Sequence, residues 1–389
     1  MAHLPVLFGD HLDHRGNNHV ALSLCRWWNE AGKRSELTAP SADDHIASDW
    51  VQPVMGRIKR KWVYRFASTA KPRHMAEQYF LKKERHSPVV YLWAGLSTEI
   101  FQAFHDVGAS IVIERINCHR RTGKRVIQAA SAAWGIPTDD PFDPRAVEGE
   151  DHKLSLVSSI FCPSPMVRRS LIESGVPEAK LMSTSYGWAP ERFLQREAPR
   201  VRQPGHRPTF LFVGSICVRK GVPLLLKAWE RADLNAELVL CGRVAPEIEK
   251  HMPPLNTFKN VRHLAFTDRI GEVYNDADVF VFPTLEEGGP MVTYEAMAHG
   301  VPPLVTAMGA GAVVEDGVSG VVLPDLDVDA WAQAMTQFAH DADRRESLGR
   351  EAKRRAQDFT WQAVAAQRAA LLQPRHPTLW NEPSSHGRD

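Results

Sequence analysis

The chain has 389 residues, of which 43% are apolar and 24% are charged, and its formal net charge is +1. This length accommodates two domains, and the composition is ordinary for a globular protein. A net charge so close to zero argues against a nucleic-acid binder. The five cysteines are widely spaced and odd in number, which argues against a disulfide framework or a zinc site.

The N-terminal residues lack the basic region and the long apolar run of a signal peptide. Apolar runs elsewhere fall well short of the roughly 20 residues that a membrane span requires. We therefore expect a cytoplasmic protein that does not cross a membrane.

Short apolar segments bounded by turn residues predict the strands of the first half of the chain. They are apolar on both faces, which is typical of a parallel sheet covered by helices on both sides. Helical patterns over residues 19–31 and 165–174 alternate with them. The predicted strands cover residues 4–8, 89–93, 110–113 and 160–162.

The second half repeats this alternation, which indicates an α/β architecture. Its predicted strands cover residues 209–213, 237–240, 279–282 and 303–306, and its clearest helices cover residues 222–231, 292–298 and 328–340. A stretch without apolar periodicity, residues 196–208, is interpreted as a linker. We expect two Rossmann-like domains, residues 1–195 and 196–372, facing each other across a ligand cleft, and a flexible tail over residues 373–389.

The segment from Pro283 to Gly300 carries the clearest chemical pattern. A buried strand ends at Phe282, a loop with adjacent glycines follows, and a helix begins near Pro290, where proline is tolerated. The N–H groups of the first helical turn, together with the helix dipole, favour an anion such as phosphate. The backbone groups expected at this site belong to Gly288, Gly289, Pro290, Met291 and Val292.

Two carboxylates flank this predicted phosphate site. Glu287 lies in the loop and Glu295 lies more than one turn into the helix. A carboxylate accepts two hydrogen bonds, which suits the vicinal hydroxyls of a ribose or a pyranose. The alternative is a structural loop in which Glu287 only places charge at the helix start.

The spacing Glu287-x7-Glu295, continued by Ala-Met-Ala-His-Gly-Val-Pro, resembles the signature of the family 4 retaining glycosyltransferases, or glycosyl transferases group 1. The resemblance implies the GT-B fold, with an N-terminal acceptor-binding domain and a C-terminal domain that binds the donor. It further implies that Glu295 holds the ribose of the donor nucleotide and that Glu287 faces the hydroxyls of the donor sugar.

Residues 212–221 resemble the glycine loop of the same family, which ends in Lys-Gly before a helix. Lys220 is a compact cation suited to neutralising a leaving diphosphate. The family often has Arg after the first glycine, Gly214, whereas this chain has Ser215. Arg219 is our candidate for the missing phosphate contact, with a solvated surface charge as the alternative, and Arg243 is expected near the nucleotide base.

Further segments support the resemblance, which is dense from about residue 164 to residue 372 and thin before that. The last helix, about residues 360–372, is expected to pack back on the first domain, as is common in this fold. The supporting segments are residues 186–193, 274–283, 317–324 and 359–361.

In the first half, a predicted strand runs into a polar loop at its cleft-facing end. Family members often have a histidine here that contacts the donor sugar, and His119 is the candidate. Glu114, Arg115 and Asn117 are expected to line the same site. The alternatives are a structural His119 and a structural ion pair between Arg115 and Glu114.

The loop after the first strand is expected to bind the acceptor, through Gly16, Asn17, Asn18 and His19. The spacing of His11 and His14 provides too few ligands for a metal site. An acidic run at residues 325–329 lacks the glycine and the distant glutamate of a calcium loop. No metal is therefore expected.

Between Arg57 and Arg85 the chain has ten Lys and Arg residues, two acids and several aromatic residues. Basic and aromatic residues in a helical stretch are typical of a membrane-surface patch. The alternatives are a solvated helix face or a nucleic-acid surface. We expect peripheral contact with the inner face of the cytoplasmic membrane and no binding of nucleic acid.

Taken together, these patterns predict a metal-independent retaining glycosyltransferase that uses a UDP-sugar or GDP-sugar and no further cofactor. The expected catalytic residues are His119, Glu287 and Lys220. The resemblance implies a saccharide or lipid-linked acceptor, in the synthesis of bacterial cell-surface polysaccharide, lipopolysaccharide or glycolipid. The alternatives are a nucleotide-sugar epimerase of the same fold and a catalytically degenerate protein that binds sugar or lipid.

Overall fold

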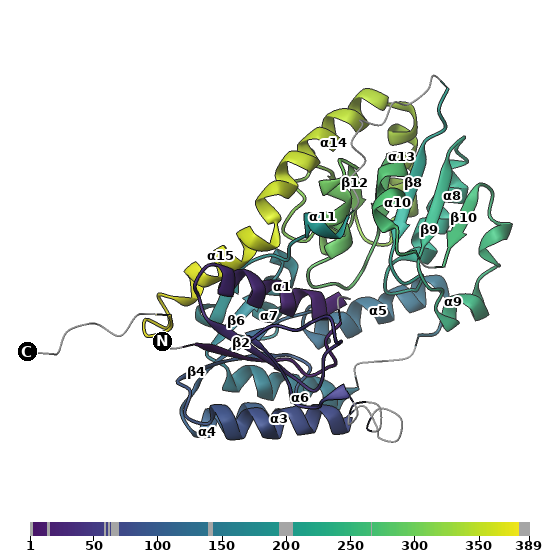
Figure 1. Ribbon diagram of the computed structural model, residues 1–389. Coiled ribbons are helices and arrows are strands. Elements are labelled where there is room, and N and C mark those ends of the chain that lie inside the picture. The colour runs from purple at the N-terminus through teal and green to yellow at the C-terminus, as the bar shows by residue number, and fades with distance from the viewer. Residues whose placement is uncertain are drawn as a thin grey trace, which may run out of the picture.

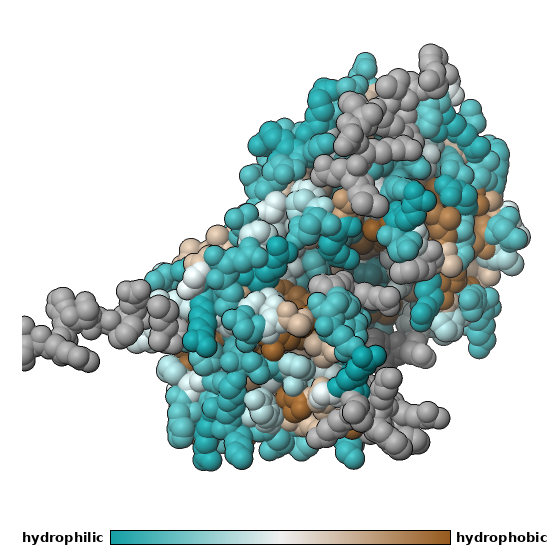
Figure 2. All heavy atoms as spheres, viewed as in Figure 1, coloured by the Kyte–Doolittle hydropathy of each residue, from teal (hydrophilic) through white to brown (hydrophobic). Residues whose placement is uncertain are grey.

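The structure is a computed structural model that describes residues 3–13, 16–57, 60, 63, 70–138, 143–193, 205–265 and 267–380. Each half of the chain forms a parallel sheet covered by helices on both faces (Figure 1). Figure 2 shows that one face of the molecule is largely hydrophilic and is hollowed between the two halves.

In the first half, the described residues form a seven-stranded sheet of order β3-β2-β1-β4-β5-β6-β7. Its strands are β1 (Leu4–Leu7), β2 (Ser35–Ala39), β3 (Val51–Pro53), β4 (Val89–Trp93), β5 (Ser110–Glu114), β6 (Ser159–Cys162) and β7 (Leu181–Ser183). Its helices are α1 (Gly16–Glu30), α3 (Ala70–Glu84), α4 (Thr98–Asp106), α5 (Arg120–Trp134), α6 (Pro144–Leu156) and α7 (Pro165–Glu173).

In the second half, the described residues form a six-stranded sheet of order β10-β9-β8-β11-β12-β13. Its strands are β8 (Thr209–Val213), β9 (Glu237–Cys241), β10 (Val261–Leu264), β11 (Val279–Phe282), β12 (Pro303–Val305) and β13 (Val321–Val322). Its helices are α8 (Val222–Ala232), α9 (Pro246–His251), α10 (Ile270–Asp276), α11 (Met291–Ala298), α12 (Ala307–Ala310), α13 (Val328–His340), α14 (Ala342–Ala356) and α15 (Trp361–Leu372).

The order of strands places the functional loops. Each sheet reverses its winding once, between β1 and β4 in the first half and between β8 and β11 in the second. Ligands of such sheets bind at the carboxyl ends of the strands on either side of this point. The point where the winding reverses is called the switch point below. The loops that follow β8 and β11 contain Gly214 and Glu287, so the second sheet brings the predicted donor residues to its switch point.

The two parallel sheets confirm the predicted α/β fold, and every strand predicted from an apolar run is present within one residue of its expected ends. Strands with polar residues were missed. For example, β10 has the exposed residues Arg262 and His263 because it lies at the edge of its sheet. The strands that the apolar runs did not predict are β2, β3, β7, β10 and β13.

Two segments run between the halves, one around Trp188 (called the crossing segment below) and one around Phe359, and their backbones form hydrogen bonds with each other. The Trp188 N–H donates to the Phe359 carbonyl at 3.0 Å, and the Trp361 N–H donates to the Trp188 carbonyl at 3.1 Å. A Cβ on Gly187 would lie 2.8 Å from the Phe359 oxygen, which is closer than real Cβ contacts come. Glycine is therefore required where the crossing segments touch.

Helix α14 runs along the second half, and α15 continues from it onto the first half beside α1 (Figure 1). The indole N–H of Trp28 in α1 donates to the Ala365 carbonyl in α15 at 2.8 Å. Packing continues beyond α15, because Leu379 is buried and the Trp380 indole donates to the Arg34 carbonyl at 2.9 Å. The flexible tail expected from residue 373 was therefore wrong through residue 380, and residues 381–389 lie outside the described part.

Most of the predicted linker, residues 196–204, also lies outside the described residues. In the described part of this linker, His206 contacts the Asp278 carboxylate at 2.8 Å. Within the described residues, no helix combines the length and apolarity needed to cross a bilayer.

A fully buried ion pair fixes α15 to the first sheet. The guanidinium of Arg368 in α15 forms a bidentate ion pair with the carboxylate of Glu114 at the end of β5, and neither side chain is exposed. Arg368 also donates to the Tyr91 hydroxyl at 3.1 Å and to the Ser185 carbonyl at 2.9 Å. A buried ion pair tolerates loss of one member poorly, because the other charge stays buried without a counter-charge.

We expect Arg368→Met to lower the free energy of unfolding by about 3–5 kcal/mol, because Glu114 keeps its buried charge without a counter-charge. Urea unfolding followed by tryptophan fluorescence measures the change. Arg350→Ala is the matched control, since Arg350 of α14 pairs with Glu346 on the surface at 2.7 Å. The double variant Glu114→Leu/Arg368→Met should recover most of the lost stability. Equal effects of Arg368→Met and Arg350→Ala would contradict the role of the buried pair.

Candidate active site

The loop after β8 is held by the loop after β9. The Ile216 N–H donates to the Arg243 carbonyl at 2.8 Å, and a Cβ on Gly242 would lie 1.9 Å from the Gly214 oxygen. Gly242 therefore has to be glycine for the loops to approach. Ser215 and Arg243 are both exposed, so the structure brings these predicted donor residues to one loop pair at the switch point.

Two cations at the end of the glycine loop face two adjacent carboxylates in the loop after β11. Lys220 pairs with Glu287, and its ammonium lies 5.4 Å from the centre of the Phe282 ring. Arg219 donates to the Glu286 carboxylate at 3.1 Å and lies 3.6 Å from that of Glu287. Arg219 is thus part of the site, and the alternative of a solvated surface charge is wrong.

Glu286 is the site residue that the sequence did not single out. Burial raises the pKa of its carboxyl group, and the neighbouring charge of Glu287 adds to this, while Arg219 opposes it. Burial disfavours the charge of Arg219 too, but both carboxylates outweigh burial and raise its pKa. The only sequence signal for Glu286 is that it precedes Glu287.

Glu295 lies on α11, with its carboxylate in reach of two groups. The Tyr274 hydroxyl donates to it at 2.9 Å, and Arg192 from the crossing segment lies 3.8 Å away. Burial raises the pKa of Glu295, and Arg192 and Tyr274 oppose this. The sequence did not assign a role to either partner, although both lie in segments that support the resemblance.

Helix α11 begins at Met291, directly after Pro290, as the sequence predicts. The first N–H groups of a helix lack the partner four residues earlier that later ones have, and α11 starts in the loop that follows β11 at the switch point. Gly288 and Gly289 were expected to let a ligand approach, but here they admit other parts of the protein. A Cβ on Gly288 would lie 2.0 Å from the Ile116 oxygen, and one on Gly289 would lie 2.5 Å from the Tyr186 ring.

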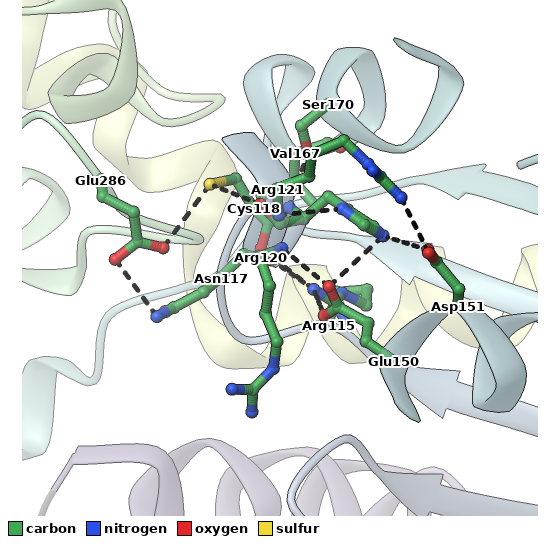
Figure 3. Close-up of polar contacts among 11 residues, drawn as sticks. Arg115, Asn117, Cys118, Arg120, Arg121, Glu150, Asp151, Val167, Ser170 and Glu286 are labelled. Carbon is green, nitrogen blue, oxygen red and sulfur yellow. Dashed lines mark hydrogen bonds and ion pairs between the residues drawn. The ribbon is translucent and has the colours of Figure 1, made fainter. Parts of the chain in front are cut away.

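The loop between β11 and α11, which contains the predicted donor residues and is called the donor loop below, therefore contacts the first half directly (Figure 3). Asn117 pairs with Gly288 in a short antiparallel bridge, and its amide donates to the Glu286 carboxylate at 3.3 Å. The Cys118 thiol contacts the same carboxylate at 3.6 Å. Of the polar residues expected after β5, Asn117 is thus the one that the structure brings to the donor loop.

His119 is placed differently from our prediction. Its side chain is fully buried and caps α5, where the Nδ1 atom accepts the Arg121 N–H at 3.2 Å. The Nε2 atom lies 2.9 Å from Asp151 and 3.3 Å from Glu150. Burial lowers the pKa of His119, although both carboxylates oppose this. These contacts lie within the first half, so the geometry supports the structural alternative and not contact with the donor sugar.

Glu114 and Arg115 also have structural partners, but not each other. Glu114 pairs with Arg368, whereas Arg115 contacts the Glu150 carboxylate at 2.7 Å. Arg115 further donates to the carbonyls of Asn117 at 3.2 Å and Cys118 at 3.0 Å. The expectation that both line the donor site is corrected: Arg115 shapes the loop that reaches the donor residues.

The predicted acceptor loop divides into exposed and structural residues. Gly16 and Asn17 are exposed, whereas the Asn18 amide donates to the His11 carbonyl at 2.9 Å and to Asp13 at 2.8 Å. His19 is buried, 5.9 Å from the Trp361 ring. Asn18 and His19 therefore support the loop, and only Gly16 and Asn17 keep the exposure that our prediction of acceptor contact requires.

Of the two histidines considered for a metal, the structure describes only His11. The ring of His11 lies 2.8 Å from the Ser41 hydroxyl and 3.1 Å from Asp43, and His14 lies outside the described residues. In the described part of the chain, no cluster of three or more potential ligands is arranged to hold a metal ion.

Much of the basic stretch between Arg57 and Arg85 lies outside the described residues. Within α3, Phe80 is buried 5.6 Å from the Phe104 ring and belongs to the core, whereas Tyr79 is 42% exposed. Arg73 pairs with Asp10 at 2.7 Å. Membrane contact through this stretch stays a prediction.

Comparisons with known proteins agree with this geometry. Residues 207–341 match the family model described as "Glycosyl transferases group 1". A D-inositol 3-phosphate glycosyltransferase of Corynebacterium glutamicum is 29% identical over 195 residues, which cover 46% of this chain and 47% of the relative. A protein of the same name from Salinispora tropica is 30% identical over 213 residues, which cover 50% of this chain and 43% of the relative. The match spans about half the length of these curated relatives.

Solved structures resemble the whole chain at low sequence identity. Sucrose-phosphate synthase of Thermosynechococcus elongatus has a TM-score of 0.71 at 18% identity, covering 97% of this chain and all of that one (100%). HepE of Anabaena in complex with UDP and glucose has a TM-score of 0.62 at 12% identity, and the match covers 96% of this chain and 100% of that one. WaaG, a glycosyltransferase involved in lipopolysaccharide biosynthesis, has a TM-score of 0.65 at 15% identity, and the match covers 95% of this chain and 99% of that one.

These matches confirm the resemblance that the Glu287-x7-Glu295 spacing suggested. The family match covers the sheet that contains the donor loops, and the structural likeness extends to the first half. Residues 207–341 form a glycosyl transferases group 1 domain, and the chain as a whole has the GT-B fold of two Rossmann-like halves.

Proposed function

We propose that the protein is a retaining glycosyltransferase that moves a sugar from a nucleotide-diphospho-sugar to an acceptor hydroxyl. One observation carries this proposal: Arg219 and Lys220 face Glu286 and Glu287 at the switch point, beside the start of α11. This arrangement puts cations for a diphosphate next to carboxylates for sugar hydroxyls. The bound UDP of HepE, a protein of the same fold, supports a UDP-sugar as donor.

Binding of the donor would change the partners of these charges. Lys220 and Arg219 are each paired with a carboxylate in the structure, so this group of four charges is neutral as a whole. A diphosphate attracts both cations and the N–H groups at the start of α11. Glu287 would then turn to the hydroxyls of the donor sugar, and Glu295 would accept the ribose hydroxyls.

Catalysis would depend on stabilising the leaving group. As the bond between the anomeric carbon and the phosphate oxygen breaks, negative charge grows on the diphosphate. Lys220 and Arg219 are fixed groups that interact more strongly with this developing charge than with the intact donor. Retention of configuration would follow from attack on the same face, assisted by the departing phosphate oxygen, as the family resemblance implies.

A nucleotide-sugar epimerase uses the same fold and is the second candidate. Incubation with donor alone separates the two, because an epimerase converts it without an acceptor. A degenerate sugar- or lipid-binding protein is the third candidate, and the paired Lys220 and Glu287 argue against it. As for the acceptor, relatives in lipopolysaccharide synthesis support a role in cell-surface glycan or glycolipid synthesis.

We expect Lys220→Ala to lower kcat/KM by roughly 10²-fold or more, because a cation that stabilises the leaving diphosphate is lost. Release of UDP from UDP-glucose, with or without acceptor, provides the assay. Lys250→Ala is the control, since Lys250 is exposed on α9 and lies outside the donor loops. Near-normal turnover of Lys220→Ala would remove this role of Lys220.

Glu295→Gln should weaken nucleotide binding by roughly tenfold or more, because a charged acceptor of the ribose hydroxyls is lost. Calorimetry with UDP, GDP and ADP measures the effect and identifies the base. Glu272→Gln tests for a non-specific effect, because Glu272 is an exposed residue of α10 that pairs with Arg269. Equal affinity of Glu295→Gln and wild type for the preferred nucleotide would exclude the ribose role.

Turnover is expected to persist in EDTA, because Lys220, Arg219 and the start of α11 supply the positive charge that the leaving diphosphate needs. Initial rates with UDP-glucose are compared before and after EDTA treatment, and again after addition of manganese. Activity that disappears with EDTA and returns with manganese would contradict metal independence.

A further inference from the structure

The phenol of Tyr274 lies beside the Glu295 carboxylate, which the proposed function assigns to the ribose. Its hydroxyl donates to this carboxylate at 2.9 Å, although the two residues belong to different helices, α10 and α11. The Tyr274 side chain is fully buried. A buried phenol requires a hydrogen-bond partner, and a carboxylate is among the strongest acceptors that a protein contains.

Aromatic rings hold this phenol in one position. The His299 ring stacks on it with 5.1 Å between ring centroids, and the centroids of Phe193 and Phe280 lie 6.2 Å and 6.4 Å away. The His299 ring is itself fixed, because its Nδ1 atom contacts the Glu295 carbonyl at 2.6 Å. Rings packed in this way restrict rotation of the Tyr274 side chain, so the hydroxyl keeps its direction toward Glu295.

The protonation states of the two groups suit a donor and an acceptor. Burial raises the pKa of Tyr274 well above its usual value, and the charge of Glu295 adds to this, so the hydroxyl stays protonated. Burial also raises the pKa of Glu295, whereas the charge of Arg192 and the hydrogen bond from Tyr274 lower it. The hydroxyl therefore favours the ionised carboxylate, the form in which both oxygens accept hydrogen bonds.

The Glu295 carboxylate keeps acceptor positions for a ligand. Two carboxylate oxygens provide about four such positions, and the Tyr274 hydroxyl takes one of them, on Oε2. The Arg192 guanidinium lies 3.8 Å from Oε1, which is an ion-pair distance longer than a hydrogen bond. The Glu295 side chain is 12% exposed, which leaves an approach for the hydroxyls of a ribose.

We propose that Tyr274 is a positioning residue for nucleotide binding. Its hydroxyl fixes one oxygen of Glu295 and so turns the carboxylate to accept the 2′- and 3′-hydroxyls of the ribose. Tyr274 acts only through Glu295 and does not itself touch the nucleotide. This inference rests on the proposed function, because it requires that Glu295 holds the ribose. Its consequence is that removing one hydroxyl group outside the nucleotide contacts weakens the binding of ribose nucleotides selectively.

Tyr274→Phe in the full chain tests this role, because it removes the hydroxyl and keeps the ring. The probes are the nucleoside diphosphate that wild type binds best among UDP, GDP and ADP, and its 2′,3′-dideoxy analogue, which lacks both ribose hydroxyls. In calorimetry, Tyr274→Phe should weaken binding of the ribose nucleotide by roughly fivefold and binding of the dideoxy analogue by less than about twofold. Added to Glu295→Gln, it should change the affinity by less than about twofold, because the two residues act as one unit.

Tyr294→Phe is the matched control. Tyr294 is also fully buried and directly precedes Glu295 on α11, but its hydroxyl accepts the Ala312 N–H at 3.1 Å. This variant loses a buried hydroxyl in the same half of the protein, so it should keep the wild-type preference for the ribose nucleotide over the dideoxy analogue. Thermal unfolding verifies that each variant is folded.

A merely structural Tyr274 gives a different pattern, in which Tyr274→Phe weakens binding of both nucleotides to the same extent. That pattern would overturn the proposal, as would unchanged affinity for the ribose nucleotide or losses from Tyr274→Phe and Glu295→Gln that add in full. If Glu295→Gln alone leaves the affinity unchanged, the ribose role of Glu295 is wrong, and the positioning role of Tyr274 with it. Absence of nucleotide binding in wild type would remove this inference and also count against the proposed transferase function.

Discussion

The buried contact between Arg368 and Glu114 is the constraint on which the arrangement of the two halves depends. It fixes the last helix to the first sheet, and through the Ser185 carbonyl it holds the segment that leads into the second half. The next residue, Tyr186, lies against Gly289 of the donor loop, and its hydroxyl donates to the Arg115 carbonyl at 3.3 Å. A continuous set of contacts thus joins α15, the crossing segment, the loop after β5 and the donor loop. Because each buried charge of Arg368 and Glu114 requires the other, this set of contacts depends on their pair.

Charge is balanced locally in the candidate site, and this has a functional consequence. Arg219 and Lys220 would repel each other if they were unpaired at the switch point, but Glu286 and Glu287 neutralise them. The site is therefore organised before a donor arrives, which limits the reorganisation needed during reaction.

Much of the donor side was predictable because its residues are close in sequence. Glu287, Gly288, Gly289 and Glu295 share one loop and one helix, so their spacing along the chain determines their placement in space. His119 shows where such reasoning fails. Its position after a strand suggested a cleft-facing side chain, but the residue caps α5, and carboxylates from α6 hold its ring. Nothing in the local sequence indicates that Glu150 and Asp151 would lie beside it, because a separate helix brings them there.

The sequence by itself determined the parallel α/β halves and the strand-loop-helix unit around Glu287. These follow from apolar patterning and from short-range spacing, which act within one element or between consecutive ones. Only the tertiary structure decided the partners of Glu114, Arg115 and Glu286 and the approach of Asn117 to the donor loop. The physical reason is that a buried charge takes whichever opposite charge the packing brings within reach, and that partner can lie anywhere in the chain. Glu114 and Arg368 are 254 residues apart, a separation that no local pattern encodes.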